Sequence, residues 1–133
     1  MTGWRAGVAA CAAGLMLAGC GTAADQRKAR IATERFYAAV SAKDGGTACA
    51  QLSPDTRSQL VKDESEPDCA KAVLKLKLHG TRASVVHVYS TSAEVVLAGG
   101  DTVFLGETKG GWRIEAVGCR RVDKGPYECE EQA

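Results

Sequence analysis

The pattern of hydrophobic residues changes near the middle of the chain, and this change limits the fold more than any other feature. Between residues 25 and 80, apolar residues recur every three or four positions, as on one face of a helix. From residue 81 onward, short runs rich in Val, Thr and aromatic residues are separated by turn-forming residues. Helices followed by strands predict an α+β domain, with the helices packed on one face of an antiparallel sheet.

The boundaries of these elements follow from residues that start or stop regular structure. Gly45-Gly46 should end the first helix, because glycine readily adopts the left-handed conformation found after helix C-termini. Ser53-Pro54 is a typical helix start, with serine as the N-cap and proline in the first turn. We expect helical segments at 25–43, 47–52, 54–63 and 67–80. We expect about four meandering strands at 81–91, 93–98, 102–107 and 112–117.

The first nineteen residues have the layout of an export signal. Arg5 precedes an uncharged stretch, residues 6–19, that is rich in Ala, Leu and Val. This stretch is shorter than the about 20 residues that a helix needs to span a bilayer. We therefore expect residues 1–19 to be a signal peptide and not a permanent membrane span.

Leu17-Ala18-Gly19-Cys20, at the end of this stretch, resembles the lipobox of bacterial lipoproteins. The resemblance implies cleavage before Cys20, a lipid anchor on its thiol, and a location on the extracytoplasmic face of the cell membrane. Residues 20–24 would then be a lipidated tether and residues 25–133 a single domain. The alternative is an ordinary secretory signal that ends near Ala23-Ala24, with Cys20 as an incidental thiol.

The charge of the chain argues against nucleic acid as a partner. The chain has 17 Lys and Arg against 16 Asp and Glu, and Arg5 is the one basic residue before Cys20. The charges that follow Cys20 therefore balance, and no basic excess remains to neutralise phosphates. The same balance provides no polybasic membrane patch, so attachment to the membrane would depend on the lipid.

Four further cysteines predict disulfides, because small exported domains form and keep such bonds. Sequence alone permits three pairings, and proximity favours Cys49–Cys69 with Cys119–Cys129. Gly125-Pro126 should reverse the chain, so that the C-terminal segment folds back beside the last main strand. The spacings of 20 and 10 residues differ from those of zinc sites, so we expect no metal and no cofactor.

The order of elements also resembles a known family. Phe36-Tyr37 before Asp44, the Leu52-Ser53-Pro54 stretch and Gly111-Trp112-Arg113-Ile114 are similar to small lipoproteins of high-GC Gram-positive bacteria. Those proteins have a nuclear transport factor 2-like, or cystatin-like, α+β fold. The resemblance implies a curved sheet wrapped around the helices as a cone with a pocket. The residues expected to line or fill this pocket are Phe36, Val40, Val86, Val88 and Phe104.

The sequence contains no nucleotide-binding loop, serine-nucleophile elbow or zinc-protease motif. His87 alternates with Tyr89 along the first expected strand, so an acid–base pair of His87 with Asp44 or Asp101 is the alternative that would make an enzyme. Asp101 itself is expected in a turn, and His79 at a helix C-terminus. We expect a non-enzymatic domain that binds an envelope protein or an apolar small molecule, or that plays an accessory role.

Overall fold

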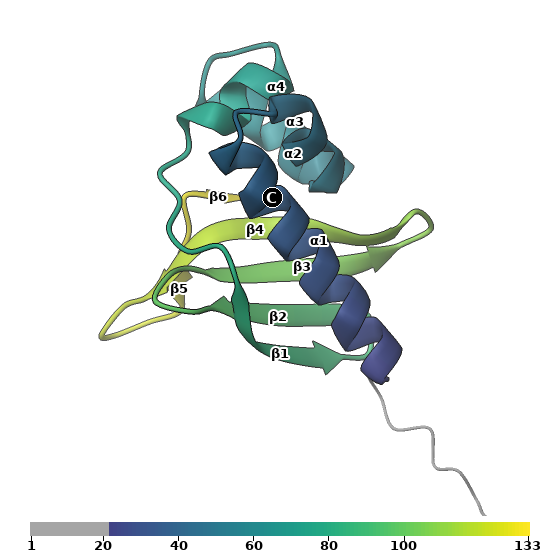
Figure 1. Ribbon diagram of the computed structural model, residues 1–133. Coiled ribbons are helices and arrows are strands. Elements are labelled where there is room, and N and C mark those ends of the chain that lie inside the picture. Colours follow the sequence, from purple (N-terminus) through teal and green to yellow (C-terminus); the bar gives the residue numbers. More distant parts are fainter. Residues whose placement is uncertain (1–21) are drawn as a thin grey trace, which may run out of the picture.

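The computed structural model describes residues 22–133. The expected signal peptide and Cys20 lie outside these described residues. Helix α1 (Ala23–Ser41) crosses one face of an antiparallel sheet diagonally, and the shorter helices gather beyond its C-terminal end (Figure 1). These are α2 (Gly45–Gln51), α3 (Pro54–Asp63), α4 (Cys69–Ala72) and the 3₁₀ turn η1 (Val73–Lys75). We refer to residues 45–75 as the helical apex. The α+β class predicted from the sequence is confirmed.

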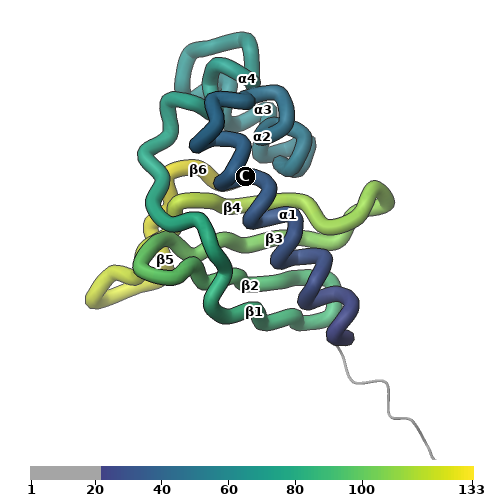
Figure 2. Tube along the Cα trace, in the orientation of Figure 1, coloured from purple at the N-terminus to yellow at the C-terminus, as the bar shows by residue number. Residues whose placement is uncertain are grey.

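The sheet has six strands, two more than expected. The strands are β1 (Ala83–Tyr89), β2 (Ser92–Leu97), β3 (Thr102–Thr108), β4 (Gly111–Arg121), β5 (Tyr127–Glu128) and β6 (Glu131–Gln132). The first four form the expected meander, in the order β1-β2-β3-β4. The last two are short, and both pair with β4 (Figure 2). The C-terminal segment therefore folds back beside the last long strand, as Gly125-Pro126 predicts.

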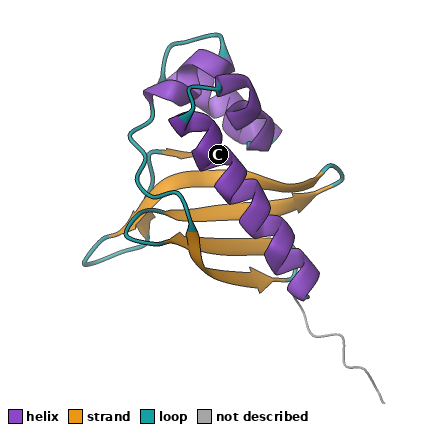
Figure 3. Ribbon diagram, in the orientation of Figure 1, coloured by secondary structure: helices purple, strands orange, loops and turns teal. Residues whose placement is uncertain are grey.

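Helix α1 supplies the largest contact with the sheet. The Thr22 hydroxyl accepts a hydrogen bond from the Asp25 N–H and caps the helix, so the helix starts at Ala23, two residues earlier than expected. Residues 23 and 24 are consequently helical and do not form a tether. The buried stripe of α1 includes Phe36, which is fully buried in the core. Figure 3 shows α1 lying across one face of the strands.

The helical apex depends on caps and on one covalent link. Ser53 and Pro54 start α3 as the sequence predicts, and the Ser53 hydroxyl accepts from the Thr56 N–H. The Cys49–Cys69 disulfide joins α2 to α4. Gly45 lies so close to the backbone carbonyl of Ala70 that any Cβ at this position would overlap it. The apex is therefore packed at backbone contact distance.

The helix expected over 67–80 is much shorter in the structure. It starts at Cys69 and ends at Ala72; after η1 the backbone becomes extended at Leu76. The chain then has to run from the apex to β1 at the far edge of the sheet, which a continuing helix would not reach. His79 consequently lies in an extended segment and not at a helix C-terminus.

Strand β4 is the longest strand and has neighbours along its outer edge. The Ser53 N–H donates to the Ile114 carbonyl at 2.8 Å, and Leu52 forms a parallel bridge with Ile114. Farther along the strand, β6 pairs with Ala116 and Val117, and β5 pairs with residues 120 and 121. This arrangement fixes the apex and the C-terminal segment to one strand.

Candidate functional site

The cysteines after Cys20 form the two pairs that sequence proximity favours. Cys49 is bonded to Cys69, and Cys119 to Cys129. The first disulfide lies within the apex, and the second ties β4 to the segment after β5. Residues 22–133 contain no group of three or more His, Cys, Asp or Glu side chains that could hold a metal ion. None of the helices among these residues is both long enough and apolar enough to cross a membrane.

The five residues expected to share a pocket do not lie together. Phe36 is fully buried, and Val40, Val86 and Val88 pack against the same core. Phe104 is on the other face of the sheet: it pairs with Glu94, which pairs with the exposed His87, and its ring packs edge-on against Tyr127 at 5.0 Å. The structure has one depression beside Asp101 and another between α1 and β4, and none of the five residues lines either of them.

The histidine and carboxylates of the enzyme alternative are also separated. His87 is exposed on the outer face of β1, where its ring lies 6.2 Å from that of Tyr89. Asp44 caps α2 at the apex, where it accepts hydrogen bonds from the N–H and hydroxyl of Thr47, and these bonds lower the pKa of its carboxyl group. Among residues 22–133, neither Asp44 nor Asp101 is within ion-pair distance of His87.

Asp101 has a role that the sequence did not reveal. Its side chain is 1% exposed, and its Oδ2 accepts hydrogen bonds from the Tyr37 hydroxyl at 3.0 Å and from the His79 N–H at 2.7 Å. Its own N–H donates to the His79 carbonyl at 2.9 Å. We call Tyr37, His79 and Asp101 the Asp101 cluster. It joins α1, the segment before β1 and the β2–β3 turn.

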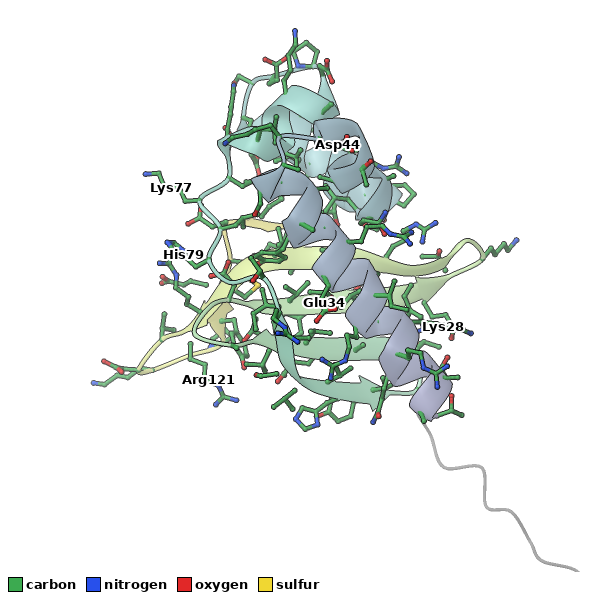
Figure 4. The ribbon with its side chains drawn as sticks, viewed as in Figure 1. Lys28, Glu34, Asp44, Lys77, His79 and Arg121 are labelled. Carbon is green, nitrogen blue, oxygen red and sulfur yellow. A yellow bond between two sulfur atoms is a disulfide. The ribbon has the colours of Figure 1, made fainter. Side chains whose placement is uncertain are left out.

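The Asp101 cluster borders a pocket of about 250 Å³, which His79, Gly99, Gly100 and Arg120 also line. The His79 side chain projects outward from the extended segment (Figure 4) and is 63% exposed, with its Nδ1 3.8 Å from Asp101 Oδ1. That separation is too long for a hydrogen bond. Burial, and then the charge of Asp101, raise the pKa of the Tyr37 hydroxyl far above its usual value. The tyrosine therefore acts as a fixed hydrogen-bond donor, and the cluster has the geometry of a structural clamp.

A second carboxylate is buried where the apex meets the C-terminal segment. Glu131, on β6, is 3% exposed, and its Oε1 accepts a hydrogen bond from the Gln132 N–H. Burial raises the pKa of Glu131 to about 7, and repulsion from Asp63 and Glu64 at the end of α3 adds to this shift. The raised pKa marks an electrostatic cost at this contact that disappears when the group is protonated.

The second depression is a surface groove of about 200 Å³ between α1 and the start of β4. We call it the α1–β4 groove. The residues of interest in it are Lys28, Ile31, Arg35, Gln51, Trp112 and Arg113. Lys28, Ile31 and Arg35 lie on one side of α1 at helical spacing, a pattern visible in the sequence. The position of Arg113 beside them depends on the tertiary fold.

The chain matches no protein-family model, no curated protein and no solved structure. The geometry of residues 22–133 is therefore the source of any functional inference. It includes two depressions, the pocket beside the Asp101 cluster and the α1–β4 groove. They differ in whether their polar groups are already paired. The polar groups of the Asp101 cluster are bonded to one another, whereas the guanidinium groups of the α1–β4 groove have no carboxylate partner within residues 22–133.

Proposed function

We propose that the chain is a lipoprotein anchored by Cys20 to the extracytoplasmic face of the cell membrane, and that its domain is a non-enzymatic binding or accessory module. One observation carries this proposal. Helix α1 begins at Ala23, three residues after Cys20 of the Leu17-Ala18-Gly19-Cys20 sequence, and the domain contains two disulfides. Disulfides form and persist in the oxidising compartments that an export signal leads to.

Binding is favoured over catalysis because of where the reactive side chains lie. His87 is exposed and has no ion-pair partner among the described residues, and the Asp101 carboxylate already accepts two hydrogen bonds. A general base needs to be within hydrogen-bond reach of its partner and of the reacting proton. We therefore keep the enzyme alternative out of the proposal.

We further propose that the domain belongs to the nuclear transport factor 2-like, cone-shaped proteins that its sequence resembles. A long N-terminal helix across one face of a meandering antiparallel sheet supports this relationship. The interior between α1 and the sheet is filled by large apolar side chains, including Phe36, Leu105 and Ile114. Binding would therefore use the rim or the outer surface and not the centre of the cone.

The anchor is tested by Cys20→Ser in the full chain, expressed in a bacterium that processes lipoproteins. We expect uncleaved precursor to accumulate and the acyl-modified mass to disappear from the membrane fraction, because the thiol that accepts lipid is gone. Cys11→Ser is the matched control, since this cysteine also lies before the mature domain. It should leave both the mass and the cleavage unchanged. A mature N-terminus at Ala24 or Asp25 in the unaltered chain would show an ordinary secretory signal and refute the anchor.

A further inference from the structure

The α1–β4 groove has an unbalanced set of charges. Lys28, Arg35 and Arg113 all line it, and none of its lining residues is Asp or Glu. Among residues 22–133, Arg35 and Arg113 have no carboxylate within ion-pair distance, and Lys28 approaches only Asp25, at 3.9 Å. The Arg113 guanidinium donates to the Trp112 carbonyl at 3.0 Å, which leaves its remaining N–H groups free.

The same groove has an apolar part. Ile31 is 46% exposed, and few large hydrophobic side chains among the described residues are as accessible. Trp112 is 3% exposed and lines the groove; among residues 22–133 its buried Nε1–H has no partner within hydrogen-bond distance. The nearby Asp25 carboxylate has a lowered pKa, first because of the Thr22 hydroxyl and to a smaller extent because of Trp112. Asp25 lies near this end of the groove, but its carboxylate is engaged by the Thr22 hydroxyl at 2.8 Å. Exposed apolar surface beside unpaired cations is the combination that an amphiphilic anion would satisfy.

We propose that the α1–β4 groove binds a small amphiphilic anion, a phosphate or carboxylate attached to a short apolar portion. Arg35 and Arg113 hold the anionic group, because planar guanidinium groups donate paired hydrogen bonds to such oxygens. Ile31 and Trp112 contact the apolar portion. The groove is smaller than the about 300–1,000 Å³ of pockets that hold drug-sized ligands, so the apolar portion is short.

This inference rests on the binding part of the proposed function and is independent of the lipid anchor. It is tested on residues 22–133, which contain all the described elements, the core and both disulfides. The chain has two tryptophans, Trp4 and Trp112, so Trp112 is the one left in this fragment. Its fluorescence therefore reports on the groove itself.

The probe is hexyl phosphate. Inorganic phosphate and hexanol, tested separately, represent its anionic and its apolar half. We expect saturable quenching or a spectral shift with hexyl phosphate, and at least tenfold weaker binding of each half. Arg35→Gln and Arg113→Gln should each weaken hexyl phosphate binding about tenfold, because each removes charged hydrogen bonds. Ile31→Ser should weaken hexyl phosphate but leave inorganic phosphate unchanged. Unchanged thermal melting of each variant shows that the fold is intact.

Arg27→Gln is the matched control, since Arg27 is exposed on the same helix but does not line the groove. It should leave binding unchanged. Vesicles of phosphatidylglycerol and of phosphatidylcholine separate two sources of the anion. Arg35-dependent binding to the anionic vesicles identifies a lipid headgroup, and binding of soluble hexyl phosphate alone identifies a free metabolite.

Three results would overturn the inference: no saturable change up to about 10 mM hexyl phosphate, equally tight binding of hexanol, or an equal loss of binding in Arg27→Gln. These results would leave the anchor untouched, because the Cys20 experiment measures processing and not ligand binding. Conversely, normal groove binding together with an ordinary secretory N-terminus would refute the anchor alone.

Discussion

The helical apex and the sheet are stabilised in different ways, although each has one disulfide. The apex consists of short helices, of which the α-helix α4 has four residues and η1 three, and helices of this length are not stable alone in water. They are held by side-chain caps, by the backbone contact at Gly45 and by the Cys49–Cys69 bond. The sheet is built on its four long strands, β1–β4, which pair in sequence order and share a buried face that includes Val95, Val103 and Ile114.

This difference in stabilisation indicates that the two disulfides contribute differently to the stability of the molecule. Cys49–Cys69 connects elements that have little structure of their own, so the apex depends on it. Cys119–Cys129 ties the two-residue strand β5 and the segment around it to a sheet whose register is already fixed by β1–β4. Losing the second bond should therefore loosen only a local segment.

Removing each disulfide tests this comparison and should give the largest effects. Cys49→Ala with Cys69→Ala should lower the free energy of unfolding by about 3 kcal/mol, and the shorter loop at Cys119–Cys129 predicts about 2.5 kcal/mol. Native-state hydrogen exchange distinguishes the effects of losing the two disulfides more clearly than the free energy of unfolding does. The first pair should speed exchange across the apex, and the second only at residues 120–130. Slow exchange throughout the apex of the first variant would show that caps and packing suffice.

The Asp101 cluster connects the two regions and predicts an intermediate effect. Tyr37→Phe removes a hydrogen bond to a buried carboxylate and should lower the free energy of unfolding by about 2 kcal/mol. Amide exchange at residues 76–82 should accelerate, because the segment between apex and sheet is less firmly held. Tyr89→Phe, at an exposed position on β1, is the control and should change neither measurement. Equal effects of both substitutions would contradict the clamp.

Glu131 predicts an effect on stability that depends on pH. Its folded-state pKa of about 7 lies above the ordinary glutamate pKa of 4.5, so the folded chain retains a proton that the unfolded chain has lost. The free energy of unfolding should therefore fall as pH rises from about 4.5 to about 7. Glu131→Gln should flatten this slope and raise the free energy of unfolding at pH 8, because the neutral amide removes the buried charge. Glu128→Gln, exposed on β5, should leave the slope unchanged; denaturant titrations across this range measure both.

Local signals predicted the elements well, and long-range contacts explain the differences. Ser53-Pro54 placed the start of α3 correctly because capping is a local interaction. Phe104 was assigned to the wrong face because Val103, Phe104 and Leu105 are all apolar, and the sequence does not say that Tyr127 covers the outer face. Asp101 was correctly expected in a turn, but its side-chain partners lie 64 and 22 residues away.

The candidate site was harder to predict than the fold. The basic face of α1 could be predicted from helical spacing, but the approach of Arg113 and Trp112 depends on how β4 is placed. The family resemblance implied a pocket that apolar residues line or fill, and Phe36, Leu105 and Ile114 are among the side chains that fill the space between α1 and the sheet.

The outer edge of β4 is hydrogen-bonded to other parts of the same chain, and this affects how easily two molecules could associate through their sheets. Exposed strand edges can pair with other molecules and seed aggregates. One edge of this sheet is occupied by Ser53, β6 and β5 in turn. At the opposite edge, the Ala83 N–H donates to Glu34 and the Ala83 carbonyl accepts from Arg30, so two side chains of α1 cover the start of β1. Arg30 and Glu34 thereby occupy the backbone groups through which another strand could pair at the start of β1.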